Sequence, residues 1–206
     1  MTSHPGKMTA EIFAAMAASR KVCEHLHLPA QAGSNRILKA MGRHYTREEY
    51  LEIVRAGRAA VPGLALASDF IVGFPGETEA DFEQTAELMR EARFQNCFIF
   101  KYSPRPGTRA EKMADDVPDA EKARRNHELL RIQEQISREE NARKIGATVE
   151  IMADGVSPND PSRWHGRTRQ NDIVVFTNDG KAQAGDLVKI RITAATALTL
   201  FGMAND

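Results

Sequence analysis

The run LALASDFIVGF, residues 64–74, is almost continuously apolar. Strands of a parallel sheet that are buried on both faces have this composition, whereas strands with one solvated face alternate apolar and polar residues. Strand-like segments also occur at residues 21–29 and 94–103, and helical patterns separate the three segments. Parallel neighbours need such crossover connections. The first half of the chain is therefore predicted to form a parallel α/β layer.

The helical patterns between these strands carry their own start signals. Thr46 and Glu49 have the spacing of a capping box before a helix expected at residues 47–61. Thr78 and Asp81 repeat the signal before the next helical pattern. The repetition of strand, polar loop and capped helix supports successive crossover units.

The second half of the chain has a different pattern. From Pro118 a long charged segment has apolar residues at helical spacing, and Gly146 stands where such a helix would end. Short β-like pieces separated by turn residues follow, as in a small antiparallel barrel. We place the domain boundary between residues 1–140 and 141–206. The β-like pieces are ATVEIMADGV, RWHGRTR, DIVVFT, DLVKIRIT and ATALTLFG.

Composition limits the classes of protein and site that fit. The 206 residues carry 28 basic and 28 acidic side chains, so an RNA contact would need a local basic cluster. Neither a run of about eighteen apolar residues nor a signal-peptide pattern occurs, which indicates a cytoplasmic protein without a membrane segment. The two cysteines, Cys23 and Cys97, lie far apart in apolar stretches. We expect them to be core residues, not a disulfide or metal ligands.

Polar residues follow each of the three predicted strands. The carboxyl ends of parallel strands meet at one edge of the sheet, where α/β proteins bind ligands. Asp69 would be costly inside a strand without a partner, and Gly73 would let a ligand approach the backbone. We therefore predict a shared ligand site at this edge. Its candidate residues are Gln31, Ser34, Asp69, Gly73, Glu77, Tyr102, Ser103, Arg105 and Arg109.

Some of these residues also have a simpler structural interpretation. Gly33 and Ser34 suit a tight turn followed by a helix N-cap. Glu77 suits a solvated position at a helix start, where the helix dipole favours negative charge. The prediction of a ligand site therefore rests on the three loops together.

Three segments, in this order, resemble the strand-end motifs of the radical S-adenosylmethionine methylthiotransferases: KVCEHLHLPAQAGSNRILKAMGRHYTREEY, LASDFIVGFPGETEADF and FIFKYSPRPGTRA. A later segment, GRTRQNDIVVF, resembles the C-terminal TRAM domain of that family, a small RNA-binding β-barrel. Within the family, the segments are most similar to the members that act on isopentenyladenosine in tRNA. The resemblance implies an α/β fold with a partial parallel (β/α) barrel, followed by a small OB-like antiparallel barrel.

The resemblance also implies radical chemistry on a tRNA. Family members use an iron–sulfur cluster to cleave S-adenosylmethionine, and they add a methylthio group to carbon 2 of a modified adenosine in the anticodon loop. Here Gln31 and Ser34 would lie near the methionine or ribose part of the cofactor, and residues 71–77 near its adenine. Tyr102 and Ser103 would line the same pocket. None of these residues is expected to act as a catalytic base or nucleophile.

The cysteine motifs of the family are absent from this sequence. Full-length members hold two 4Fe–4S clusters, one on an N-terminal domain and one on a Cys-x-x-x-Cys-x-x-Cys loop, and such clusters need several converging thiolates. This chain has Cys23 and Cys97 alone. We therefore expect a truncated product or a fragment that is inactive by itself. A monomer is expected, with the missing N-terminal half as a candidate partner beside tRNA.

In the predicted barrel, basic residues surround the single tryptophan of the chain. Cationic side chains can neutralise RNA phosphates while an indole stacks on a base. The simpler alternative is that Trp164 belongs to the barrel core and that the arginines are ordinary solvated charges. The candidate RNA-binding residues are Arg163, Trp164, His165, Arg167, Arg169 and Asn171.

Two other functions fit the same sequence. The first is a stand-alone RNA-binding protein without catalysis, which would bind tRNA but neither iron nor S-adenosylmethionine. The second is a sister methylthiotransferase that acts on another tRNA adenosine or on a ribosomal protein. Mass spectrometry of modified nucleosides would separate the second from the isopentenyladenosine type.

Overall fold

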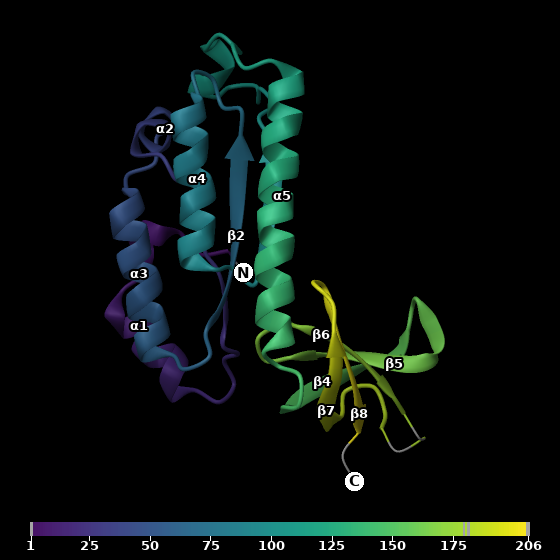
Figure 1. Cartoon of the computed structure of the whole chain (residues 1–206). Helices are drawn as coiled ribbons and strands as arrows, with labels where there is room; N and C mark the ends of the chain where they lie inside the picture. Colours follow the sequence, from purple (N-terminus) through teal and green to yellow (C-terminus); the bar gives the residue numbers. More distant parts are fainter. Residues whose placement is uncertain (1, 179, 181, 205–206) are drawn as a thin grey trace. The chain divides into compact units, whose positions relative to one another are not determined.

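The structure, a computed structural model, describes residues 2–178, 180 and 182–204. The chain divides into two compact units. Unit 1 comprises Met1–Val22 and Leu26–Gln133, and unit 2 comprises Cys23–His25 and Glu134–Asp206. Figure 1 labels the helices and strands of both units. No helix of the described residues is both long enough and apolar enough to cross a membrane.

Unit 1 alternates strands and helices, as the sequence predicts. Its sheet has the order β1-β2-β3, and β2 pairs with β3 in parallel, with Val72 opposite Lys101. The parallel α/β layer is therefore confirmed. The elements of the chain up to residue 142 are η1 (Pro5–Lys7), α1 (Ala10–Ala18), β1 (His25–His27), α2 (Asn35–Ala40), α3 (Arg47–Ala60), β2 (Ala65–Val72), α4 (Glu79–Ala92), β3 (Asn96–Lys101), η2 (Arg109–Lys112) and α5 (Asp119–Ala142). Of these, His25 of β1 and the part of α5 from Glu134 on belong to unit 2.

The first strand is much shorter than the nine residues expected, because it begins at His25 and ends at His27. Pro29 has no backbone N–H to donate to a neighbour. Beyond it, Gln31 still donates to the carbonyl of Asp69 at 2.8 Å and accepts from the amide of Ile71 at 2.9 Å. The chain thus stays beside β2 to the edge of the sheet without forming a continuous ladder.

The two faces of the sheet differ, although the apolar run of β2 suggested burial on both. Phe70 and Val72 are fully buried, whereas the alternate residues Asp69 and Ile71 are partly exposed. On β3, Phe98 and Phe100 are 50% and 54% exposed. Because side chains alternate along a strand, one face forms the core of unit 1 and the other is open over much of β3.

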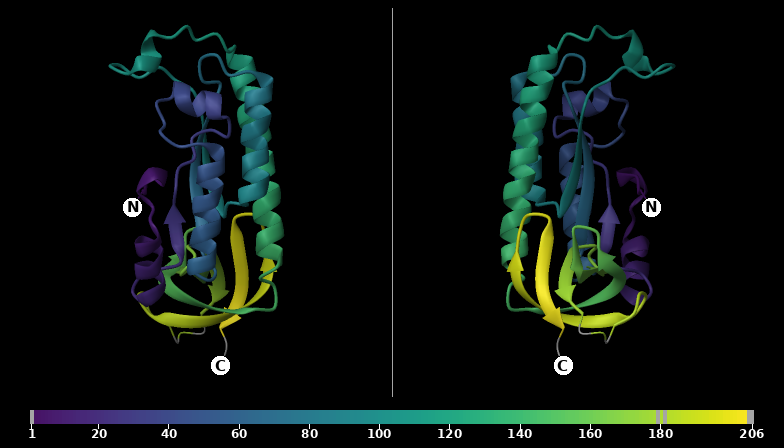
Figure 2. Two further views of the ribbon diagram at one scale, coloured as in Figure 1. Left: turned by 90° about the vertical axis from the view of Figure 1, so that its left-hand side faces the viewer. Right: turned by 90° about the vertical axis from the view of Figure 1, so that its right-hand side faces the viewer.

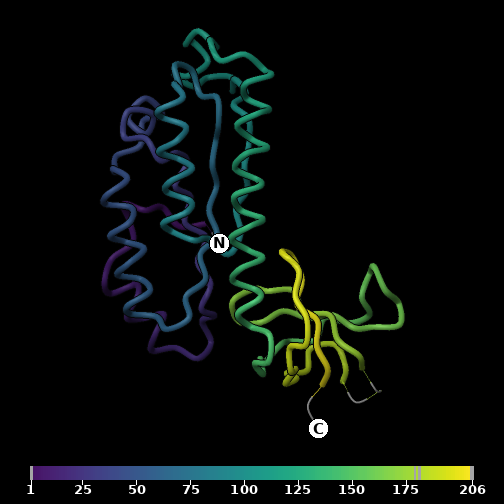
Figure 3. The backbone as a smooth tube through the Cα atoms, in the orientation of Figure 1, coloured from purple at the N-terminus to yellow at the C-terminus, as the bar shows by residue number. Residues whose placement is uncertain are grey.

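Both predicted capping boxes are present. Thr46 accepts from the amide of Glu49 and Glu49 accepts from the amide of Thr46, and Thr78 and Asp81 make the same pair of bonds. Each box begins a helix of 14 residues, α3 and α4. The long charged segment forms α5, which has 24 residues and is traced without a break in Figure 3. At about 1.5 Å per residue it is about 36 Å long.

Unit 2 contains a closed barrel with the strand order β4-β5-β6-β8-β7, seen from two sides in Figure 2. The predicted barrel is confirmed, but it is mixed and not wholly antiparallel, because β6 and β8 run parallel. A closed ring with an odd number of strands cannot have every neighbour antiparallel. The strands are β4 (Thr148–Ser157), β5 (Asp160–Thr168), β6 (Ile173–Thr177), β7 (Leu187–Ala195) and β8 (Thr199–Ala204).

The barrel is filled by inward-facing apolar side chains from all of its strands except β5. On β5 a glycine takes the corresponding place, because a Cβ atom at Gly166 would lie 2.2 Å from the carbonyl oxygen of Met152. Trp164, also on β5, packs against this core from its side. The core residues are Ile151, Ala153, Val174, Phe176, Ile190, Ile192 and Leu200.

Candidate functional site

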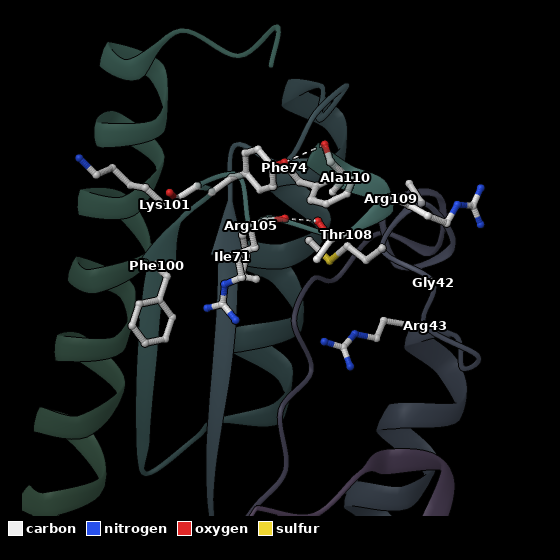
Figure 4. A pocket seen from close by; sticks show the side chains of 14 residues that line it. Gly42, Arg43, Ile71, Phe74, Phe100, Lys101, Arg105, Thr108, Arg109 and Ala110 are labelled. Carbon is white, nitrogen blue, oxygen red and sulfur yellow. Dashed lines mark hydrogen bonds between the residues drawn. The ribbon is translucent and has the colours of Figure 1, made fainter. Parts of the chain in front are cut away.

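A cavity of about 430 Å³ opens in unit 1 where β2 and β3 end. Apolar and aromatic side chains line it together with cationic ones, as Figure 4 shows. None of the described lining residues is acidic. The lining residues include Arg43, Ile71, Phe74, Phe100, Lys101, Tyr102, Ser103, Arg105 and Arg109.

The loop after β3 forms one wall of this cavity, and it contains the predicted residues Tyr102 and Ser103. The Tyr102 ring packs edge-on against Phe74 with 5.2 Å between ring centres, and its hydroxyl donates to the carbonyl of Ala110 at 3.0 Å. The Lys122 ammonium lies 5.6 Å from the centre of the Tyr102 ring. An apolar wall of fixed orientation suits the flat face of an aromatic ligand.

Arg43 was missed by the sequence analysis. It follows α2, lines the cavity, and its Nε atom is buried with no hydrogen-bond partner in the described part of the chain. In Figure 4 its guanidinium group is directed toward the middle of the cavity. A buried donor without a partner is costly, so an acidic ligand group would stabilise this arrangement. The available sequence signal was an arginine directly after Gly42, at the end of a short helix.

Gln31 stands at the same edge in a strained conformation. Its φ is +69°, which is uncommon for a residue other than glycine, and such strain clusters at functional sites. Its side-chain amide has no hydrogen-bond partner in the described residues. Asp69, on the adjoining strand, accepts from His27 through one carboxylate oxygen, with 2.9 Å between His27 Nε2 and Asp69 Oδ1. The predicted cofactor contacts of Gln31 and Asp69 remain predictions.

Gly73 and Glu77 form the loop after β2, and α5 covers them. The Gly73 amide donates to Glu77 Oε2 at 2.6 Å, and Arg125 NH1 donates to the same oxygen at 2.8 Å. Burial raises the pKa of Glu77, although the bonds from Gly73 and Arg125 oppose this rise. The Glu77 carboxylate is therefore buried and not solvated. Its hydrogen bond from the Gly73 amide connects the two ends of the loop.

Ser34 is buried and caps α2, as the simpler interpretation has it. Its hydroxyl donates to Asp81 Oδ1 at 2.6 Å and accepts from the amide of Ile37. Arg36 and Thr78 complete the bonds to the Asp81 carboxylate. Burial alone would raise the pKa of Asp81, but these hydrogen bonds outweigh it and lower the pKa. The hydroxyl of Ser34 is thus already in use, and its contact with a cofactor stays a prediction.

The two cysteines do not fit an iron–sulfur cluster. Cys97 is buried as expected, and burial raises the pKa of its thiol well above the usual value, whereas Cys23 is exposed and not a core residue. Cys23 lies two residues before β1, outside the helices and strands of the described chain. Across the residues that the structure describes, no three His, Cys, Asp or Glu side chains are placed to hold a metal ion. Clusters need several converging thiolates.

In the barrel, β5 separates the predicted RNA-binding residues onto two faces. Arg163 and Arg167 are exposed on the outer face with the partly buried His165, whereas Trp164 packs against the core. Arg167 NH1 donates to Asn171 Oδ1 at 3.0 Å, and Asn171 has a φ of +69°. The Arg169 guanidinium donates to both carboxylate oxygens of Glu24, at 2.7 and 2.9 Å. The charge of Arg169 is therefore already paired.

Comparison with known proteins matches both units to families. The model of the radical SAM superfamily matches residues 1–89, and that of the TRAM domain matches residues 142–204. Curated proteins named tRNA-2-methylthio-N(6)-dimethylallyladenosine synthase are 50% identical in Carboxydothermus hydrogenoformans, and 47% identical in Moorella thermoacetica and Phocaeicola vulgatus. Each alignment covers 98% of this chain but 46%, 45% and 44% of the relative. The chain thus spans about half the length of these relatives.

A solved structure has a related fold. Coproporphyrinogen III oxidase (HemN) from Escherichia coli, a radical SAM enzyme, matches with a TM-score of 0.56 and 12% identity, over 82% of this chain and 45% of that chain. At this identity the likeness shows the fold alone. The family models match residues 1–89 to the radical SAM superfamily and residues 142–204 to the TRAM domain, and 98% of the chain aligns with the relative named tRNA-2-methylthio-N(6)-dimethylallyladenosine synthase from Carboxydothermus hydrogenoformans.

Proposed function

We propose that the chain is the C-terminal part of a tRNA methylthiotransferase that adds a methylthio group to isopentenyladenosine. Unit 1 would hold S-adenosylmethionine and the barrel would contact the anticodon arm of the tRNA. The observation that carries the proposal is the 50% identity over 98% of the chain with a relative of that name. Because about half of that relative lies outside the aligned region, an N-terminal half is the proposed partner.

The cavity of unit 1 suits the parts of S-adenosylmethionine. The cofactor carries a carboxylate, an amino group, ribose hydroxyls and an adenine ring. Arg43 and Arg105 are cations without acidic partners at the cavity, and they suit the carboxylate. Gln31 and Asp69 are not among the residues that line the cavity, but they lie on the neighbouring strand ends and offer polar groups for the ribose and amino groups. Phe74 and Tyr102 provide an apolar wall for the adenine.

The proposal assigns binding and orientation to these residues. When bound to a reduced cluster, the cofactor supplies the radical in such enzymes, and the protein positions it and excludes water. The two cysteines of this chain do not fit the cluster. The iron content of the purified chain therefore does not test whether unit 1 binds S-adenosylmethionine.

Calorimetric titration of the purified chain with S-adenosylmethionine tests the cofactor site. We expect binding that Arg43→Gln weakens about tenfold or more, since one charge-assisted contact contributes about 1.5 to 3 kcal/mol. Lys7→Gln is the matched control, because Lys7 is exposed and outside the cavity lining. No binding by the unmodified chain would favour a stand-alone RNA-binding protein.

The nucleoside substrate is tested in cells. Deletion of the coding sequence should remove the methylthio group from isopentenyladenosine in tRNA while the isopentenyl group remains, as measured by mass spectrometry of digested tRNA. Loss of a mark on a different adenosine, or on a ribosomal protein, would instead assign the chain to a sister methylthiotransferase.

A further inference from the structure

The segment after β3 carries four exposed cationic side chains that have no acidic partner among the described residues. Two of them, Arg105 and Arg109, were noted in the sequence as candidate residues of the strand-end site, and the others come from the end of β3 and from η2. We refer to this set as the loop cations. They are Lys101, Arg105, Arg109 and Lys112.

Several arginines elsewhere in unit 1 form ion pairs with carboxylates, whereas the loop cations do not. Arg36 pairs with Asp81, Arg47 with Glu87, and Arg125 with Glu77. The chain as a whole has equal numbers of basic and acidic residues. A group of unpaired cations on such a chain produces a local positive potential that attracts anions.

Hydrogen bonds within the loop that carries these cations restrict its conformation. Thr108 Oγ1 donates to the carbonyl of Arg105 at 2.9 Å, and the Gly107 amide donates to Glu111 Oε2 at 2.7 Å. Prolines on both sides of Arg105 restrict the backbone further. Because less conformational entropy is lost when a preorganised loop binds, this loop is better suited to recognition than a flexible basic segment.

The loop cations are directed to different places around the cavity. In the view of Figure 4, Arg105 extends toward Ile71, on the side of the cavity that Arg43 faces. Lys101 and Arg109 extend away from the cavity on opposite sides of it. These two outward cations are therefore not placed to share the carboxylate that Arg43 and Arg105 would bind.

We propose that Lys101 and Arg109 bind backbone phosphates of the substrate RNA on the two sides of the nucleotide that enters the cavity. The inference rests on the proposed function and extends it, since it gives unit 1 an RNA contact of its own beside that of the barrel. Exposed cations bind a single small anion weakly because water solvates both charges. A polyanion binds them better, since each neutralised phosphate releases counterions. Aromatic side chains beside the cations are the usual partners of an unstacked base, and Phe100, next to Lys101, is 54% exposed.

The test is the salt dependence of RNA binding by the full chain. The probe is an RNA hairpin with the sequence of a tRNA anticodon arm, and its affinity is measured by fluorescence anisotropy at several salt concentrations. The double variant Lys101→Gln with Arg109→Gln should bind about fivefold to thirtyfold more weakly, given up to about 1 kcal/mol for each exposed contact. The slope of log affinity against log salt should fall by about 1.4, since each phosphate on a single strand contributes about 0.7.

A matched control removes the same charge elsewhere. Lys7 and Lys21 are exposed and outside the cavity lining, and the double variant Lys7→Gln with Lys21→Gln should leave the slope unchanged. Circular dichroism confirms that each variant is folded, and Arg109→Glu provides a second variant whose affinity should fall further. S-adenosylmethionine binding is measured in parallel on Lys101→Gln with Arg109→Gln, because both residues also line the cavity.

The outcomes separate this inference from the proposed function. RNA binding with an unchanged slope in the loop variant would overturn the phosphate contact and leave the function standing. Loss of S-adenosylmethionine affinity, with RNA affinity unchanged, would show that these cations bind the cofactor instead. A chain that binds no RNA hairpin at all would overturn both the proposed function and the contact that rests on it.

Discussion

The guanidinium of Arg125 lies 2.8 Å from the carboxylate of Glu77, and neither side chain is more than 6% exposed. The same NH1 group also donates to the backbone carbonyl of Glu77 at 3.0 Å. Glu77 in turn accepts from the amide of Gly73. The N-terminal part of α5 thus holds the loop between β2 and α4, which forms one side of the proposed cofactor site.

Removal of one partner of this buried pair should destabilise unit 1 strongly. Arg125→Met leaves the Glu77 carboxylate buried without its counter-charge, which costs about 3 to 5 kcal/mol. The measurement is urea unfolding. Arg138→Met is the control, because Arg138 is 67% exposed and its pair with Glu134 should contribute less than about 1 kcal/mol. Equal losses in the two variants would show that the buried pair is not what holds the loop.

A second prediction concerns Gly73, whose φ is +70° and where a Cβ atom would lie 2.3 Å from Lys122 Cγ. Gly73→Ala should destabilise the protein by about 1 to 3 kcal/mol and weaken S-adenosylmethionine binding, because the loop and α5 must move apart. Gly42→Ala separates the two causes. Gly42 has a φ of +73° with nothing within 4 Å of the added Cβ. The difference between the two alanine variants in unfolding free energy measures the clash with Lys122 alone.

A third prediction follows from the pKa of Asp81, which hydrogen bonds lower from its usual value of 3.8. An acid with a lowered pKa in the folded state stabilises the protein above its usual pKa, and this stabilisation is lost as the pH falls toward the folded value. The native chain should therefore lose stability as the pH drops below about 4. Asp81→Asn should be less stable at neutral pH and should lose less stability on acidification, as thermal unfolding across this pH range would show. Parallel losses in both proteins would assign acid sensitivity to other groups.

Much of the local structure could be predicted from local patterns. The capping boxes at Thr46 and Thr78 use residues three apart, and both formed as predicted. The barrel was also predicted correctly from the spacing of short strands, but not its parallel pair β6 and β8. Strand direction in a closed ring depends on the number of strands, which the individual segments do not reveal.

Contacts between distant residues could not be predicted in the same way. Arg125 and Glu77 are 48 residues apart. In the sequence, each is a charged residue of the kind expected at a solvent-exposed position at or near a helix. The position of Arg43 after Gly42 was too weak a signal, because its place at the cavity depends on how the loop after α2 packs near the strand ends. Of the residues predicted at the three strand ends, those of the loop after β3 line the cavity, namely Tyr102, Ser103, Arg105 and Arg109. Gln31, Ser34, Asp69, Gly73 and Glu77 are not among its lining residues.

The pairing of Arg169 with Glu24, which are 145 residues apart in the sequence, leads to the last prediction. Within unit 2, Glu24 neutralises one of the cations that the basic stretch would offer to RNA, whereas Arg167 has no acidic partner in the described chain. Arg167→Gln should weaken binding of the RNA hairpin and lower its salt slope by about 0.7 to 0.9. Arg169→Gln should have a smaller effect on both quantities.

Glu24→Gln should act in the opposite direction to these arginine variants. It removes the negative charge that the RNA would otherwise have to displace from Arg169, so affinity for the hairpin should rise and the salt slope should steepen. Glu11→Gln is the control, because Glu11 is a fully exposed carboxylate on α1 with the same charge change. If Glu24→Gln and Glu11→Gln raise the affinity equally, the gain comes from net charge. A gain specific to Glu24→Gln would place Arg169 at the RNA interface of the barrel.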